Sequence, residues 1–147
     1  MKSFKIITGE RGEGKTTYVL SHFSSTQGFV SIHRGEEYYL RNLESGAEAL
    51  LLTRKPLFSS TWKGWYINQE AFEEANETLL SYKEGVVLLD EVGMMEVEGM
   101  GFAPFLNEAI NSEIDLVITV RDKFIEKVRE RFFPSLTPTI ISTGRFS

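Results

Sequence analysis

The sequence predicts an α/β fold in which a mostly parallel central sheet is flanked by helices. Two observations support this prediction. After residue 69, helical patterns with apolar residues three or four positions apart alternate with short apolar runs that suit buried strands. Near the amino terminus, a glycine-rich segment lies between a strand pattern and a helical pattern. Strands connected through helices usually pair in parallel with right-handed crossovers, so this alternation favours a parallel sheet.

The composition is that of an ordinary globular domain. The chain has 147 residues, of which 41% are hydrophobic and 25% charged, so we expect residues 1–147 to form a single domain. The absence of cysteine excludes disulfides, thiolate metal sites and cysteine nucleophiles. No apolar run approaches the ~20 residues of a membrane helix, and no signal peptide precedes the first strand, so we expect a cytoplasmic protein without membrane contact. The net charge of −5 disfavours nucleic acid as a partner.

The first two elements surround the glycine-rich segment. Residues 2–8 are rich in apolar and β-branched side chains and predict a strand. Residues 17–23 predict a helix with Val19, Leu20 and Phe23 on its inner side.

Residues 28–68 predict a small antiparallel β insertion in place of a crossover helix, and we call this segment the insertion. Short runs of strand-forming residues alternate here with turn residues. The expected strands are residues 29–33, 37–41, 49–53 and 62–68.

The rest of the chain predicts the alternating part of the fold. Amphipathic patterns predict helices over residues 70–82, 101–111 and 122–132. Apolar runs predict strands over residues 86–90, 114–120 and 139–142.

The glycine-rich segment matches the phosphate-binding loop, or Walker A motif, which reads Gly, four residues, Gly, Lys and Ser or Thr. Glycines let several backbone N–H groups point at one anion, and the following helix adds its positive dipole end. Lys15 can then reach the β- and γ-phosphates, and the Thr16 hydroxyl can bind Mg²⁺. A flexible turn beside a solvated lysine is the weaker alternative. The expected nucleotide-binding residues are Gly9, Glu10, Arg11, Gly12, Glu13, Gly14, Lys15, Thr16 and Thr17.

Residues 86–90 have the form of a Walker B strand, an apolar run that ends in an acid. Asp90 would hold Mg²⁺ together with Thr16. Glu91 follows directly, and a carboxylate there can activate a water in line with the γ-phosphate. This pair belongs to ATPases whose sheet has an extra strand between the loop strand and the Walker B strand. We therefore predict a P-loop NTPase of the RecA-like, extra-strand type, with capping roles for the two acids as the alternative.

Residues 90–93 also fit Asp-x-x-Gly, the γ-phosphate switch of GTPases. Residues 119–122 lie near the position at which a GTPase reads guanine, but the lysine of that pattern is missing. A true GTPase switch is therefore not favoured.

Several other side chains are candidates for ligand contacts. Arg121 ends a predicted strand and could neutralise γ-phosphate charge, or it could pair with a surface acid. Arg145 could flank a base, although a solvated tail is the simpler interpretation. Trp62 and Trp65 could stack on a ring, and packing within the sheet is their commoner role.

Residues 90–96, Asp-Glu-Val-Gly-Met-Met-Glu, resemble the Asp-Glu-Ile-Gly-Lys-Met-Glu signature of the small P-loop nucleoside-triphosphatases of thermophilic archaea and bacteria, relatives of the human cancer-related nucleoside-triphosphatase. The loop at 9–17 resembles that family's Gly-x-Pro-Gly-x-Gly-Lys-Thr-Thr, and residues 28–34 resemble its Gly-Phe-x-Thr…Arg hairpin. Arg11 stands where the family tends to have Pro, and Met94 where it often has Lys. Arg11 is a candidate for supplying the missing charge. The resemblance implies slow hydrolysis of ATP, GTP and other nucleoside triphosphates with little base selectivity.

These observations give one hypothesis and two alternatives. The hypothesis is Mg²⁺-dependent hydrolysis of nucleoside triphosphates, with Lys15, Glu91 and Arg121 as catalytic residues and Thr16 and Asp90 as metal ligands. The first alternative is a nucleotide or small-molecule kinase. The second is a GTPase-like regulatory module that signals through the insertion to a protein partner, which the sequence does not identify.

Overall fold

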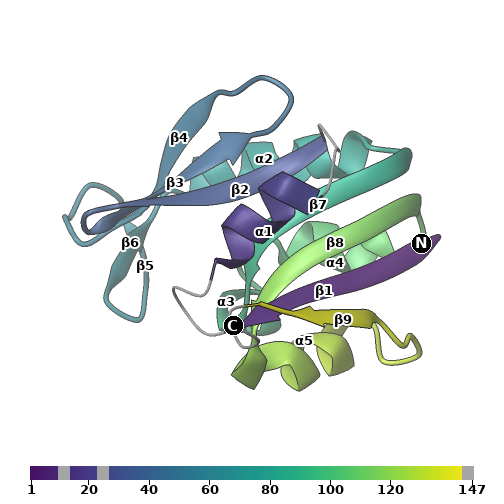
Figure 1. Cartoon of the computed structure of the whole chain (residues 1–147). Coiled ribbons are helices and arrows are strands. Elements are labelled where there is room, and N and C mark those ends of the chain that lie inside the picture. Colours follow the sequence, from purple (N-terminus) through teal and green to yellow (C-terminus); the bar gives the residue numbers. More distant parts are fainter. Residues whose placement is uncertain (10–13, 23–26, 144–147) are drawn as a thin grey trace.

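The structure is a computed structural model that describes residues 1–9, 14–22 and 27–143. These residues form a nine-stranded sheet in the order β5-β6-β4-β3-β2-β7-β8-β1-β9, with helices on both faces (Figure 1). The strands are β1 (Ser3–Gly9), β2 (Gln27–Arg34), β3 (Glu37–Asn42), β4 (Glu48–Thr53), β5 (Ser60–Trp62), β6 (Trp65–Ile67), β7 (Glu84–Val92), β8 (Glu113–Arg121) and β9 (Thr139–Ser142). The helices are α1 (Lys15–His22), α2 (Gln69–Ser81), α3 (Met94–Val97), α4 (Ala103–Ala109), the 3₁₀ turn η1 (Asp122–Phe124) and α5 (Ile125–Phe132).

The parallel core confirms the predicted fold class. Strands β2, β7, β8, β1 and β9 are neighbours, and each adjacent pair is parallel. Strand β8 lies between β1, which leads into the phosphate-binding loop, and β7, which carries the Walker B acid. It is the extra strand that the sequence predicts. Because parallel strands end at a common edge, the two motifs face each other across one strand.

Strand β2 belongs to both parts of the sheet. Its first residues, Gln27 to Phe29, pair in parallel with β7, whereas its later residues pair antiparallel with β3. The strands of the insertion pair antiparallel with one another, as predicted, but its first two residues, 28 and 29, also pair in parallel with β7, so the insertion begins inside the parallel core. Gly28 permits the close pairing, because a Cβ there would lie 2.0 Å from the carbonyl oxygen of Leu88.

Of the predicted strand over residues 62–68, residues 65–67 form β6, whereas its start is wrong because the chain turns at residues 63 and 64 to form a hairpin. Strands β5 and β6 pair antiparallel with Trp62 opposite Trp65. Lys63 and Gly64 between them have φ values of 48° and 84°, as a two-residue type I′ loop requires. The tryptophans on both sides of this loop make the sequence resemble one continuous apolar strand.

The strands bury different side chains on the two faces of the sheet. Val87 and Leu89 belong to the large core with α2, α4 and α5, whereas Leu88 belongs to a small cluster with Val19 of α1. Figure 1 shows α1 on one face and α2 and α4 on the other. Leu20 of α1 is 47% exposed, so its predicted inward position is wrong, and Phe23 lies outside the described residues.

The connection after β7 contains a short helix, α3, that the sequence analysis does not predict. Both carboxylate oxygens of the buried Glu96 accept backbone N–H groups, from Gly93 at 2.8 Å and Phe102 at 3.1 Å. Burial raises the pKa of Glu96 to about 7. The predicted helix over 101–111 is shorter, because residues 101 and 102 belong to the turn that Glu96 holds. No helix in the described ranges has the length and apolar character to cross a membrane.

Candidate active site

The phosphate-binding loop is described at its two ends. Gly9 is the last residue of β1, and Gly14 directly precedes α1. The side chain of Lys15 is buried, and its Nζ donates a hydrogen bond to the carbonyl oxygen of Gly9 at 3.0 Å. The ammonium group therefore lies at the mouth of the loop and is not a solvated surface charge. The predicted loop residues Glu10, Arg11, Gly12 and Glu13 lie outside the described residues, as does Arg145.

Thr16 and Asp90, the two predicted metal ligands, are in direct contact. The Thr16 hydroxyl donates to Asp90 Oδ2 at 2.6 Å, and the backbone N–H of Ser31 donates to the same oxygen at 3.1 Å. The hydroxyl of Thr119 donates to Asp90 Oδ1. Asp90 is only 3% exposed, and these hydrogen bonds connect it with α1, β2 and β8. Its role is therefore not that of a simple helix or turn cap. Thr17 lies in the first turn of α1 and is exposed.

A β-bulge places Glu91 beside Asp90. The register between β7 and β8 shifts between Leu89 and Val92, so Asp90 and Glu91 together oppose the single residue Thr119. In a regular strand, consecutive side chains point to opposite faces. Here the bulge re-aims one of them, and both carboxylates line the same cavity. We call Asp90 and Glu91 the acid pair.

Thr119 fixes the backbone of this bulge. Glu91 has a φ of +65°, in the left-handed region that costs a non-glycine residue roughly 1–2 kcal/mol. Its backbone N–H donates to the Thr119 hydroxyl oxygen at 2.7 Å. One hydroxyl therefore holds both members of the acid pair. In the sequence, Thr119 belongs only to a GTPase-like pattern, and its role could not be predicted because it depends on the bulge.

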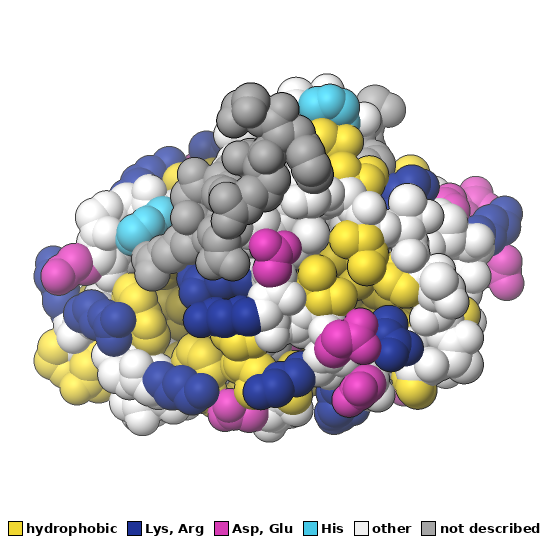
Figure 2. All heavy atoms as spheres, turned by 60° about the horizontal axis from the view of Figure 1, so that its bottom comes forward, with side chains coloured by type: hydrophobic (Ala, Val, Ile, Leu, Met, Phe, Trp, Pro, Cys, Tyr) yellow, Lys and Arg dark blue, Asp and Glu magenta, His cyan; other side chains and the backbone are white. Residues whose placement is uncertain are grey.

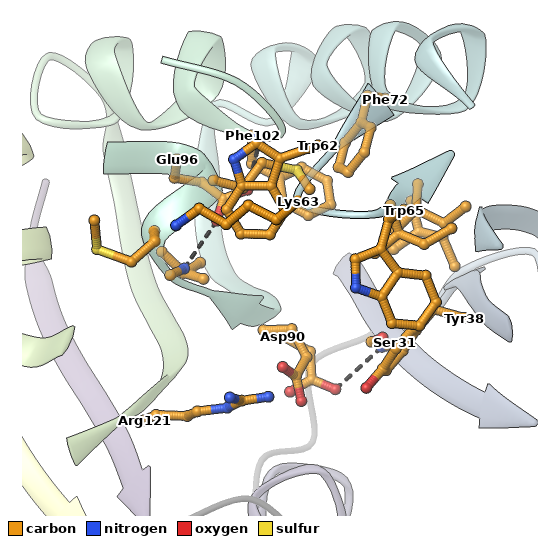
Figure 3. A pocket seen from close by; sticks show the side chains of 18 of the residues that line it. Ser31, Tyr38, Trp62, Lys63, Trp65, Phe72, Asp90, Glu96, Phe102 and Arg121 are labelled. Carbon is orange, nitrogen blue, oxygen red and sulfur yellow. Dashed lines mark hydrogen bonds between the residues drawn. The ribbon is translucent and has the colours of Figure 1, made fainter. Parts of the chain in front are cut away.

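The acid pair opens into a cavity of about 340 Å³. Arg121, the last residue of β8, lines this cavity, and Figure 3 shows its guanidinium pointing toward Asp90. Among the described residues, no carboxylate forms an ion pair with Arg121. The described part of the chain therefore gives no support to the alternative of a surface arginine paired with an acid.

The oxygen atoms at this site suit Mg²⁺. Oxygen ligands about 2.1 Å from Mg²⁺ at right angles to one another lie roughly 3 Å apart. The hydroxyl of Thr16 and Oδ2 of Asp90 are 2.6 Å apart. A slight movement of these two oxygens away from each other would give the spacing that Mg²⁺ ligands require. The described residues contain no cluster of three acidic or histidine side chains that could hold a metal alone. The residues therefore fit an ion that takes its other ligands from phosphate and water.

Three curated proteins named nucleoside-triphosphatase THEP1 are similar to this chain over most of its length. The protein from Thermotoga sp. (strain RQ2) is 29% identical over 139 residues, which cover 86% of this chain and 80% of that protein. The protein from Thermotoga petrophila is 26% identical over 139 residues, with 86% and 78% covered.

Two solved structures have the same fold. The crystal structure of THEP1 from the hyperthermophile Aquifex aeolicus matches with a TM-score of 0.69 at 23% identity, over 96% of this chain and 90% of that one. The solution structure of a human cancer-related nucleoside triphosphatase matches with a TM-score of 0.70 at 17% identity, over 98% and 90%. At these identities, the likeness shows the fold.

The family assignment is decided by a family model described as NTPase, which matches residues 5–137. This range contains the described ends of the phosphate-binding loop, the acid pair and Arg121. The chain therefore belongs to this NTPase family, the nucleoside-triphosphatases.

Proposed function

We propose that this protein hydrolyses nucleoside triphosphates to diphosphate and phosphate in a Mg²⁺-dependent reaction at the loop and the acid pair. The contact between Thr16 and Asp90, with Glu91 in the adjoining cavity, is the observation that carries the proposal. It joins a metal-binding pair to a carboxylate that faces the same space. Membership of an NTPase family supports the same reaction.

Each residue has a separate role in the proposed mechanism. Lys15 balances negative charge on the β- and γ-phosphates, and Arg121 does so at the γ-phosphate from the β8 side. Thr16 and Asp90 hold Mg²⁺, which when bound neutralises charge on the phosphate oxygens. Glu91 orients the attacking water and accepts its proton.

In this mechanism the described site residues bind phosphate and metal, and this supports a broad substrate range that includes ATP and GTP. We expect the backbone N–H groups of residues 10–16 to contribute further phosphate contacts. The cytoplasmic location and the lack of nucleic acid binding stay predictions of the sequence.

The first test is Mg²⁺-dependent phosphate release from ATP, GTP, CTP and UTP. Replacing Lys15 with Ala removes the buried ammonium group, so we expect turnover to fall by about 100-fold or more. Lys2→Ala, which changes an exposed lysine before β1, is the control and should behave like the wild type. A folded Lys15→Ala protein with wild-type turnover would contradict the proposal.

The second test separates binding from chemistry at Glu91. Glu91→Gln keeps the size of the side chain but removes its basicity, so nucleotide affinity should persist while single-turnover hydrolysis slows by roughly 10²–10⁴-fold. Glu77→Gln, on the exposed side of α2, is a matched control. Unchanged hydrolysis in Glu91→Gln would assign the base to another group. Phosphate found on an added metabolite instead of water would indicate a kinase.

A further inference from the structure

The cavity beside the acid pair extends into the insertion. Its far wall is formed by residues of β3, β4 and the β5–β6 hairpin, and its near wall by the ends of β7 and β8 and the chain that follows β7. Figure 3 shows Trp65 and Tyr38 on the side opposite Arg121, with Trp62 and Lys63 above them. The space therefore lies between parts of the chain that are distant in sequence.

This space lies beyond the expected end of a bound triphosphate. The described lining residues include Asp90, Glu91 and Arg121 but neither Lys15 nor Thr16. A P-loop lysine and hydroxyl contact the β- and γ-phosphates and their metal ion. The γ-phosphate would then meet the acid pair, and the cavity begins where that phosphate ends. This placement rests on the proposed function.

The far wall presents aromatic surface to the cavity. Tyr38 contacts Trp65 edge to face, with ring centroids 5.4 Å apart, and the guanidinium of Arg54 lies 3.6 Å from the Trp65 ring centroid. Both tryptophans are only half-buried and both line the cavity, so sheet packing alone does not account for them. Such a wall suits a planar ring, which can stack on aromatic and guanidinium faces.

Positively charged side chains line the cavity beside the acid pair. Arg54 and Arg121 line the cavity, and no carboxylate among the described residues forms an ion pair with either of them. Lys63 lies 3.5 Å from the exposed Glu98 at the rim. Figure 2 shows hydrophobic side chains in a hollow with Lys and Arg side chains along its margin. A guanidinium without a carboxylate partner favours an anionic ligand, and its planar fork matches phosphate.

We propose that this cavity is a second ligand site, which takes a nucleoside monophosphate next to the position of the γ-phosphate. The ring lies against the Trp65 and Tyr38 wall, and the phosphate faces Arg54. A volume of about 340 Å³ falls within the range of small-molecule sites and suits one such molecule.

The two tryptophans of the chain, Trp62 and Trp65, provide a direct readout, because both line the cavity. The full-length protein is first saturated with Mg²⁺ and a non-hydrolysable ATP analogue, so that the phosphate-binding loop is filled. AMP, GMP, CMP and UMP are then titrated while tryptophan fluorescence is recorded. We expect saturable quenching by at least one monophosphate. Its parent nucleoside, which lacks the anion, and inorganic phosphate, which lacks the ring, should bind at least tenfold more weakly.

Variants of neighbouring residues test the assigned contacts. Arg54→Gln should weaken monophosphate binding at least tenfold, whereas Lys55→Gln, an exposed change at the next position, should not. The proposal is overturned if no monophosphate quenches, if the nucleoside binds as tightly as its monophosphate, or if Arg54→Gln binds like the wild type. Phosphate release by the wild type, measured in parallel, tests the proposed function separately. The monophosphate titration is repeated without the ATP analogue. Binding to the cavity can then be judged even if the protein does not hydrolyse nucleoside triphosphates.

Discussion

Thr119 is the residue on which the geometry of the acid pair depends. Its hydroxyl donates to Asp90 and accepts the backbone N–H of Glu91. A single oxygen thereby orients the expected metal ligand and supports the left-handed backbone of the expected base. Thr119 is buried and contacts neither phosphate nor water in the proposed mechanism, so we regard it as a positioning residue.

Thr119→Val removes this hydroxyl and keeps the shape of the side chain. We expect kcat to fall roughly 10–100-fold with little change in nucleotide affinity, because the acid pair loses its orientation. The Glu91 N–H loses its partner, so the free energy of unfolding should fall by about 1–3 kcal/mol.

Thr119→Ser retains the hydroxyl and provides the control for this prediction. This variant loses only the methyl group, so kcat should stay near the wild-type value if the hydroxyl positions the acid pair. A wild-type kcat in Thr119→Val would show that the hydroxyl does not position the acid pair.

The site residues differ in how well sequence predicts them. Lys15, Thr16 and Asp90 belong to patterns with fixed local spacing, so their chemistry can be inferred before the fold is known. Thr119 and the N–H of Ser31 reach Asp90 through strand pairing and the bulge, neither of which leaves a local pattern. These tertiary contacts could not be predicted from the chain alone.

At the level of elements, the turn between α3 and α4 depends on Gly101. Its φ is +59°, and a Cβ at this position would lie 2.0 Å from Oε2 of the buried Glu96. Gly99, two positions earlier, has a φ of +88° and no atom within 4 Å of such a Cβ. The two glycines share a left-handed backbone and differ in the space around them.

This difference gives a matched pair of variants. Gly99→Ala should lower the free energy of unfolding by about 1–2 kcal/mol, from backbone strain alone. Gly101→Ala should lower it by at least about 2 kcal/mol more, because the buried carboxylate must leave its N–H donors. Urea denaturation of both variants measures the difference. Equal losses in the free energy of unfolding would show that displacing Glu96 does not lower stability.

The elements themselves were predicted unevenly, for physical reasons. The parallel strands are buried on both faces, so their apolar runs are visible in the sequence. Helix α3 spans only Met94–Val97, too short for a periodic pattern, and its turn is held by the carboxylate of Glu96. The sequence does not reveal the β5–β6 hairpin, because Lys63-Gly64 lies between two tryptophans that are typical of a strand.

At the scale of the whole molecule, Glu96 makes stability depend on pH. Burial raises its pKa from 4.5 to about 7, so the folded protein binds a proton that the unfolded chain releases between these values. This contribution is complete below pH 4.5 and is lost as the pH rises through 7. Stability should therefore decrease from pH 5 to pH 8, by roughly 3 kcal/mol from this group.

Thermal or urea unfolding from pH 5 to pH 8 measures this effect, with Glu96→Gln as the comparison. The amide does not titrate, so the slope should flatten, although one backbone N–H then loses its acceptor. An unchanged slope would assign the dependence to another group. Glu48 acts in a different range, because hydrogen bonds from Arg34 and Arg41 lower its pKa to about 2, and its contribution is lost only in acid below pH 4.5.

Strand β2 has a further consequence for the architecture. One uninterrupted backbone pairs first with β7 and then with β3, so no flexible linker joins the insertion to the core. The aromatic wall is thus anchored to the strand that carries the acid pair, and a ligand would find it already assembled, which lowers the entropic cost of association. The same backbone protects the side of β7. Removing the insertion together with the rest of β2 would leave Val87 to Leu89 as an unpaired, apolar sheet edge, and such a shortened chain should precipitate.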